Sequence, residues 1–131
     1  MRLVLDSGAV SRLSRRDERT AARLRLLKQE GPWPPVVPSV VLVECLSGRQ
    51  RDDVLTQRFL NEACDIDEAL PWRLARRAAE LRTLSDRVST ITAVDAVIVA
   101  MAEPNGIALS TDLDDLRALA AHAPGVVVAS V

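Results

Sequence analysis

Four acidic residues stand inside or directly after apolar runs, where folding would bury a charge. They are Asp6 after the run 3–5, Glu44 inside 40–46, Asp95 inside 91–102, and Asp112 after 107–111. A buried carboxylate is costly unless it is paired or binds a metal. Few Lys or Arg residues lie near these four in the sequence, so a shared divalent cation is the simplest compensation. The pattern therefore predicts a metal-dependent enzyme.

The composition fits one soluble domain spanning residues 1–131. Hydrophobic residues make up 48% of the chain, which is enough for a core, and charged residues make up 27%. The first residues are too soon interrupted by Asp6 to form a secretory segment, and 91–102 is too short to span a membrane. Cys45 and Cys64 lack the spacing of a metal or redox motif and are typical of buried thiols in a reducing compartment. We therefore expect a cytoplasmic protein.

Apolar runs that alternate with amphipathic segments indicate an α/β fold. The strands are expected at residues 2–5, 36–37, 64–66, 107–110 and 126–128, and the helices at 16–29, 38–46, 52–63, 71–85, 91–103 and 112–122. Strands that alternate with helices predict a mostly parallel central sheet covered on both faces, an α/β/α sandwich. The helix at 91–103 is apolar almost all round, so we expect it to be central.

This topology would bring the four acids together. Asp6 and Asp112 each follow a predicted strand, and ligands bind at the carboxyl ends of strands in open parallel sheets. Glu44 and Asp95 lie in early turns of predicted helices, among apolar neighbours that argue against exposure to solvent. Carboxylate oxygens suit Mg²⁺ or Mn²⁺, and no Cys/His cluster favours zinc. One or two such ions would activate water for attack on a phosphodiester.

Each acid also has a purely structural interpretation. Asp112 is a candidate helix N-cap with Asp115 as its capping-box partner, and Asp115 also suits the dipole of a first helical turn. Asp6 is a candidate Asx-turn residue. Glu44 and Asp95 could instead form ion pairs with arginines, although their apolar surroundings favour this least.

Four segments, each carrying one of the acids, resemble the motifs of PIN-domain nucleases. They are DSGAV at 6–10, PSVVLVEC at 38–45, TAVDAVIVAMA at 92–102 and LSTDLDDL at 109–116. The resemblance extends from residue 3 to about 128, and the order and spacing of the motifs are more specific than any single one. The family often has Thr two residues before the fourth acid. Here Ser110 holds that position, with Thr111 beside it.

At this size the chain looks like a VapC-type toxin of a type II toxin–antitoxin pair. The resemblance implies an Mg²⁺- or Mn²⁺-dependent endoribonuclease that cuts structured RNA, forms a homodimer and is held inactive by a small antitoxin. Its expected metal ligands and catalytic residues are Asp6, Glu44, Asp95 and Asp112, with Ser7, Ser110 and Asp115 as auxiliary residues. The apolar helix faces within 11–29 and 51–63 are the expected antitoxin contacts.

Three alternatives compete with this interpretation. A receiver-type signalling domain needs a lysine after its last strand, and Lys28 is the only lysine of the chain. A haloacid-dehalogenase-like phosphatase needs a second Asp where Gly8 stands. The third is a catalytically silent PIN-like scaffold that binds RNA or an antitoxin. For an enzyme, the arginines near the cleft would influence which RNA is cut. The candidates are Arg12, Arg15, Arg16, Arg49, Arg51 and Arg87.

Overall fold

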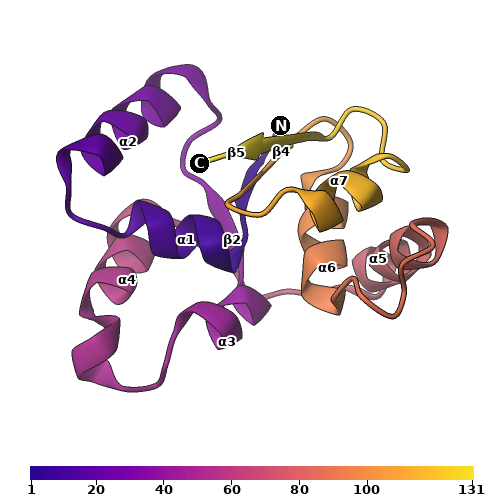
Figure 1. Ribbon diagram of the computed structural model, residues 1–131, viewed down its shortest axis with the longest axis horizontal. Helices are drawn as coiled ribbons and strands as arrows, with labels where there is room; N and C mark the ends of the chain where they lie inside the picture. Colours follow the sequence, from indigo (N-terminus) through magenta and orange to yellow (C-terminus); the bar gives the residue numbers. More distant parts are fainter.

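The predicted strands form one five-stranded parallel sheet in the computed structural model, which describes residues 1–131 (Figure 1). The strands are β1 (Leu3–Leu5), β2 (Val36–Pro38), β3 (Asp65–Asp67), β4 (Ile107–Ser110) and β5 (Val127–Ser130). Their order in the sheet is β3-β2-β1-β4-β5, and every neighbouring pair is parallel. Strand β1 is therefore central, and the chain builds outward from it in both directions.

Helices cover both faces of this sheet, which confirms the predicted α/β/α sandwich. The helices are α1 (Ser7–Leu13), α2 (Glu18–Glu30), the 3₁₀ helix η1 (Ser39–Val41), α3 (Leu42–Cys45), α4 (Gln50–Ala63), α5 (Trp72–Leu84), α6 (Ala93–Ala102) and α7 (Asp114–Ala120). Figure 1 shows α1, α2 and α4 on one side of the sheet and α5, α6 and α7 on the other.

Burial follows from this layering. All three residues of β1 are buried, because a central parallel strand meets helices on both faces and gains nothing from alternating polar residues. Helix α6 is buried over 96–102, as its all-round apolar sequence predicts. It has ten residues, and none of the helices combines the length and hydrophobicity needed to cross a bilayer.

Three helical segments differ from the sequence prediction. Helix α1 was not among the expected helices. The single helix expected over 38–46 is instead the short η1 followed by the four-residue α3, neither of which has a side-chain cap. The helix expected from Asp112 begins at Asp114, because the amide N–H of Asp112 donates to the hydroxyl of Ser110 (2.9 Å) and forms a turn. Glu44 is therefore carried by a short helix and Asp112 by a turn.

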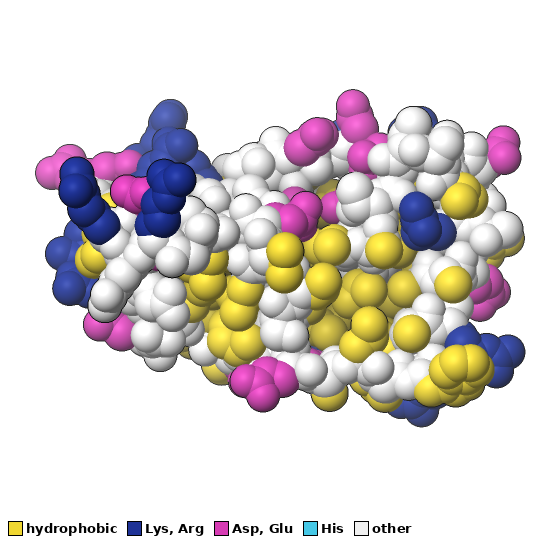
Figure 2. Space-filling model, turned by 90° about the horizontal axis from the view of Figure 1, so that it is seen from below, with side chains coloured by type: hydrophobic (Ala, Val, Ile, Leu, Met, Phe, Trp, Pro, Cys, Tyr) yellow, Lys and Arg dark blue, Asp and Glu magenta, His cyan; other side chains and the backbone are white.

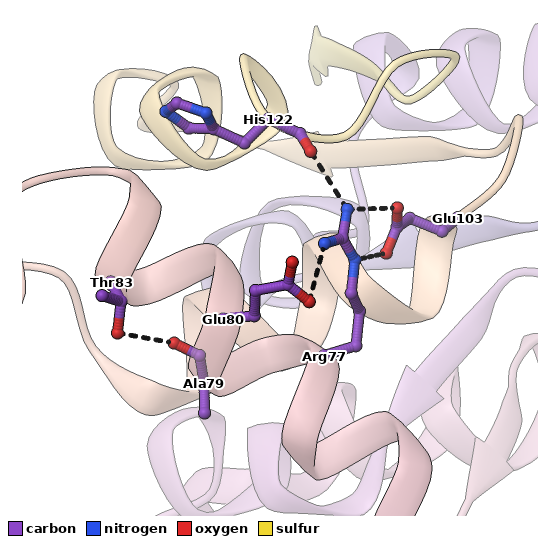
Figure 3. Close-up of polar contacts among 6 residues, drawn as sticks. All are labelled: Arg77, Ala79, Glu80, Thr83, Glu103 and His122. Atoms are coloured by element: carbon purple, nitrogen blue, oxygen red, sulfur yellow. Dashed lines mark hydrogen bonds and ion pairs between the residues drawn. The ribbon is translucent and has the colours of Figure 1, made fainter.

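One arginine ties together three elements of the layer formed by α5, α6 and α7 (Figure 3). The guanidinium of Arg77, on α5, donates two hydrogen bonds to the carboxylate of Glu103 at the end of α6 (2.7 and 2.9 Å). It also donates to the carbonyl of His122, beyond α7 (3.0 Å), and pairs with Glu80 (3.1 Å). His122 is exposed, and its imidazole takes no part in this arrangement.

Candidate active site

The centre of the site is Asp6, at the carboxyl end of β1. One carboxylate oxygen accepts the amide N–H of Ala9 (2.7 Å), which makes Asp6 the N-cap of α1 rather than an Asx-turn residue alone. The other oxygen accepts the hydroxyl of Ser110 at the end of β4. Because β1 and β4 are parallel neighbours, their carboxyl ends meet and bring these two residues together.

Burial raises the pKa of Asp6, even though the hydrogen bond from Ser110 and that from Ala9 act in the opposite direction. The charge of Asp112 adds a smaller upward contribution. The carboxylate of Asp6 is therefore destabilised by its surroundings, and a nearby cation would relieve it.

Asp95 is held at the first turn of α6. Thr92 is the N-cap of this helix, and its hydroxyl accepts the amide N–H of Asp95 (3.1 Å). Partial burial is the main cause of the raised pKa of Asp95, and the charges of Asp115 and Asp6 raise it further. The prediction that Asp95 lies in an early turn facing the other acids is consistent with this electrostatic coupling.

Glu44 departs from expectation, because its side chain is exposed. Its apolar neighbours predicted burial, but two of them are exposed themselves: Val43 is 80% accessible and Val40 is 37% accessible. A four-residue helix at the surface cannot enclose a side chain, so apolar neighbours in sequence did not mean an apolar environment. Partial loss of hydration nevertheless raises the pKa of Glu44, and the charges of Asp95 and Asp6 raise it further.

Asp112 is also exposed, contrary to the expectation of a buried charge. It precedes α7 without capping it, since Leu113 occupies the N-cap position and no side chain caps the helix. The carboxylate of Asp112 makes only a long contact with the amide of Asp114 (3.5 Å). The N-cap interpretation of Asp112, with Asp115 as its partner, is therefore wrong.

Electrostatic coupling links all four acids through Asp6. The charge of Asp112 acts on Asp6, and those of Asp6 and Asp95 act on Glu44. The acids come from β1, α3, α6 and the turn after β4, so segments distant in sequence converge at one edge of the sheet. As placed, however, the side chains include no group of three or more acids, histidines or cysteines able to hold a metal ion.

The donor chemistry of this edge fits a hard divalent cation, because the four coupled side chains are all carboxylates. Asp6 and Asp95 are fixed by hydrogen bonds close to their carboxylates or backbone. Glu44 and Asp112 are exposed and form no ion pair, so they can turn toward a cation without breaking a strong contact. The fixed pair and the mobile pair together offer enough oxygen atoms for Mg²⁺ or Mn²⁺.

The auxiliary residues divide into two kinds. Ser110 is fully buried, accepts the amide N–H of Asp112 and contacts Asp6, so it connects two of the acids. Ser7 is the first residue of α1, directly after Asp6. The charge of Asp115 contributes to the raised pKa of Asp95, and its carboxylate forms an ion pair with Arg87 (3.9 Å).

Two features of the site were missed from the sequence. A Cβ atom at Gly8 would collide with the hydroxyl of Thr111 as this side chain is oriented, so the turn after β4 lies close to the start of α1. Arg82 donates to the carbonyls of Val88 (3.0 Å) and Ile91 (2.9 Å) and so fixes the loop that leads into α6. The DSG sequence was a signal for the first feature, whereas nothing in the sequence marked Arg82 among many arginines.

Comparison with known proteins decides the family. The family model described as "PIN domain" matches residues 3–121. The chain belongs to the PIN-domain family. The match spans all four acids, and it confirms the resemblance that their motifs suggested. No curated protein sequence matches this PIN domain.

A solved structure shares the fold of this PIN domain. The crystal structure of VapBC2 from Rickettsia felis bound to a DNA fragment from their promoter contains a chain that superposes with a TM-score of 0.70. The sequence identity is 15%, and the match covers 100% of this chain and 99% of that chain. The likeness establishes a common fold over the whole of residues 1–131.

Proposed function

We propose that this PIN domain is an Mg²⁺- or Mn²⁺-dependent endoribonuclease that hydrolyses phosphodiester bonds in structured RNA. The observation that supports it best is the grouping of Asp6, Glu44 and Asp95, whose pKa values are all raised, first by burial and then by the charges of neighbouring acids. Structural carboxylates are normally placed beside cations, whereas mutually repelling carboxylates mark a functional site. PIN domains are generally nucleases, which agrees with this proposal.

In this proposal Asp6, Glu44, Asp95 and Asp112 hold the divalent cation. A bound cation would supply positive charge for the developing negative charge of phosphodiester hydrolysis and would lower the pKa of a water molecule. The chain itself orients the acids: Ser110 and Ala9 fix the carboxylate of Asp6, and Thr92 fixes the backbone at Asp95. Ser7 and Asp115 are proposed as auxiliary residues of this site.

We further propose that the protein is a VapC-type toxin with a cognate small antitoxin, acting in the cytoplasm as a single PIN-like domain. The neighbour of known structure is a VapBC2 complex, which supports an antitoxin partner. The surface between α1 and α4 suits such a partner, because Val54 (49% accessible) and Leu55 (43%) are exposed there beside Ser11 and Arg15.

A homodimer is the third part of the proposal. Figure 2, seen from the side nearest α3, shows hydrophobic side chains gathered across the middle of one hollowed face, with Lys and Arg concentrated at the end where α2 and α4 lie. Val43 contributes an 80% accessible side chain on α3. An apolar area of this kind on a small domain favours a second copy as its cover.

The experiment that tests the nuclease proposal is RNA cleavage by purified protein freed of any bound partner. Structured RNAs are incubated with Mg²⁺ or Mn²⁺, and then with EDTA. Asp95→Asn, prepared identically, controls for a contaminating nuclease. Discrete fragments that require both the metal and Asp95 support the endoribonuclease.

The alternative is a catalytically silent PIN-like scaffold that binds RNA or an antitoxin. As placed, the acids form no completed ligand set, which such a scaffold would not need. The scaffold proposal is supported instead if the folded wild type and Asp95→Asn both bind RNA and neither cleaves it in Mg²⁺ or Mn²⁺.

A further inference from the structure

The loop between α5 and α6 is tied to α5 by side-chain hydrogen bonds, although it lies at the surface. Arg82 binds the carbonyls of Val88 and Ile91 from the α5 side. Within the loop, the carbonyl of Arg87 accepts the amide N–H groups of Thr90 (3.0 Å) and Ile91 (2.8 Å). The backbone of Arg87 is therefore fixed a few residues before the helix that carries Asp95.

This geometry brings the side chain of Arg87 to Asp115. Its guanidinium lies 3.9 Å from the carboxylate of Asp115, on α7, and the two side chains are 52% and 41% accessible. The charge of Asp115 in turn acts on Asp95. Among the ion pairs of the structure, this is the one whose acid is coupled to the proposed metal ligands.

The pair is poorly suited to a stabilising role. At 3.9 Å the two groups are too far apart for a hydrogen bond, and exposed pairs of this kind contribute little to stability. The guanidinium therefore keeps its donors free, and a phosphate group is a better acceptor for them because it can be bound by two parallel hydrogen bonds.

An RNA substrate also needs such a group here. Four carboxylates at one edge repel a phosphodiester backbone, and the divalent cation offsets this only at the bond to be cut. A fixed cation at the rim would hold a neighbouring phosphate. We infer that Arg87 is a substrate-binding residue of the proposed nuclease: it binds an RNA phosphate next to the scissile bond, and Asp115 is its partner when RNA is absent.

This inference rests on the proposed nuclease function, so its test measures cleavage and binding separately. Arg87→Gln removes the charge, and Arg87→Lys keeps the charge but loses the two-pronged donor geometry. Arg58→Gln is the matched control, because Arg58 forms a similar exposed pair with Glu62 (4.0 Å; 45% and 71% accessible) that involves none of the four acids. Thermal melting of each variant checks the fold.

The measurements are kcat and KM for a labelled RNA stem-loop in Mg²⁺ at several salt concentrations. Arg87→Gln is expected to raise KM about 10-fold or more, since a charged hydrogen bond is lost, while kcat changes much less. The slope of log affinity against log salt should fall by about 1, as for one phosphate contact. Arg87→Lys should recover part of the affinity, and Arg58→Gln should resemble the wild type.

The outcomes separate the two claims. If the wild type cleaves RNA and Arg87→Gln has the KM and salt slope of Arg58→Gln, the role of Arg87 is refuted while the nuclease stands. If the wild type does not cleave, the nuclease proposal fails, and the dissociation constants for the same stem-loop decide the matter. Weaker binding by Arg87→Gln alone then supports the phosphate contact, and equal binding by all variants overturns it.

Discussion

The hydroxyl of Ser110 donates to the carboxylate of Asp6 across 104 positions of sequence. The same hydroxyl oxygen accepts the amide N–H of Asp112 (2.9 Å). A single buried side chain thus joins the first acid to the backbone of the fourth. The relative position of Asp6 and Asp112 is therefore fixed in part by Ser110.

Replacement of Ser110 by alanine should therefore damage both stability and activity. The amide of Asp112 and the carboxylate of Asp6 would each lose a buried partner, which costs about 1–3 kcal/mol of the free energy of unfolding. Loss of the hydrogen bond would also raise the pKa of Asp6 further. Denaturant unfolding and RNA cleavage measure the two effects. Ser110→Thr keeps the hydroxyl and should restore most activity; if it behaves like alanine, packing rather than hydrogen bonding explains the loss.

Neutralising Asp95 should stabilise the metal-free protein while it abolishes cleavage. Asp95 is repelled by Asp115 and Asp6, so Asp95→Asn relieves repulsion by an amount on the order of 1 kcal/mol, or a few degrees of Tm. Mg²⁺ should raise the Tm of the wild type and have much less effect on the variant, because a bound ligand stabilises only a protein that binds it. Differential scanning fluorimetry with and without Mg²⁺ gives both numbers. If Mg²⁺ changed the Tm of both proteins by the same amount, the metal would not bind at Asp95.

The raised pKa values also set a pH dependence. Asp6, Glu44 and Asp95 bind protons more tightly when folded than at their ordinary values of 3.8 and 4.5. The folded state therefore binds more protons than the unfolded state just above these values, and their contribution to stability falls as pH rises through that window. Metal-free wild type should lose more stability than Asp95→Asn between about pH 4 and pH 7. Urea unfolding at a series of pH values checks the difference, and parallel curves would contradict the coupling.

Gly8 should tolerate alanine better if Thr111 is shortened as well. A Cβ at Gly8 would collide with the Thr111 hydroxyl, so in Gly8→Ala the Thr111 side chain must rotate or the turn before Asp112 must shift, at a cost of up to about 1–3 kcal/mol. In Gly8→Ala/Thr111→Ala the obstacle is gone, and alanine is the better helix former. A double-mutant cycle measured by urea unfolding should show strong coupling. Additive effects would show that the two residues do not meet.

Much of the fold could be predicted because its signals are local. The apolar runs at residues 3–5 and 107–110 and the all-round apolar helix near Asp95 each identified their element within a few residues. Their alternation then indicated a parallel sheet, whose carboxyl edge brings separate strands together. Convergence of the four acids followed from topology rather than from any one motif.

The parts that failed depend on distant contacts. Burial of Glu44 was inferred from its neighbours in sequence, but α3 is too short to enclose it, and the exposed Val43 shows the same effect. The start of α7 was misplaced because the hydroxyl of Ser110, on the preceding strand, captures the amide of Asp112. Arg82 and Arg87 could not be singled out, because their partners are backbone carbonyls and the Asp115 carboxylate, whose positions the sequence does not reveal.

The central position of β1 governs when the site can assemble during synthesis. This strand is made first, yet it is flanked by β2 on one side and by β4, about a hundred residues later, on the other. A nascent chain that lacks residues 107–110 leaves β1 with an open edge and Asp6 without Ser110. Pairings between such distant segments form late. The first three acids therefore precede the fourth in synthesis, and the four come together only once β4 has docked beside β1.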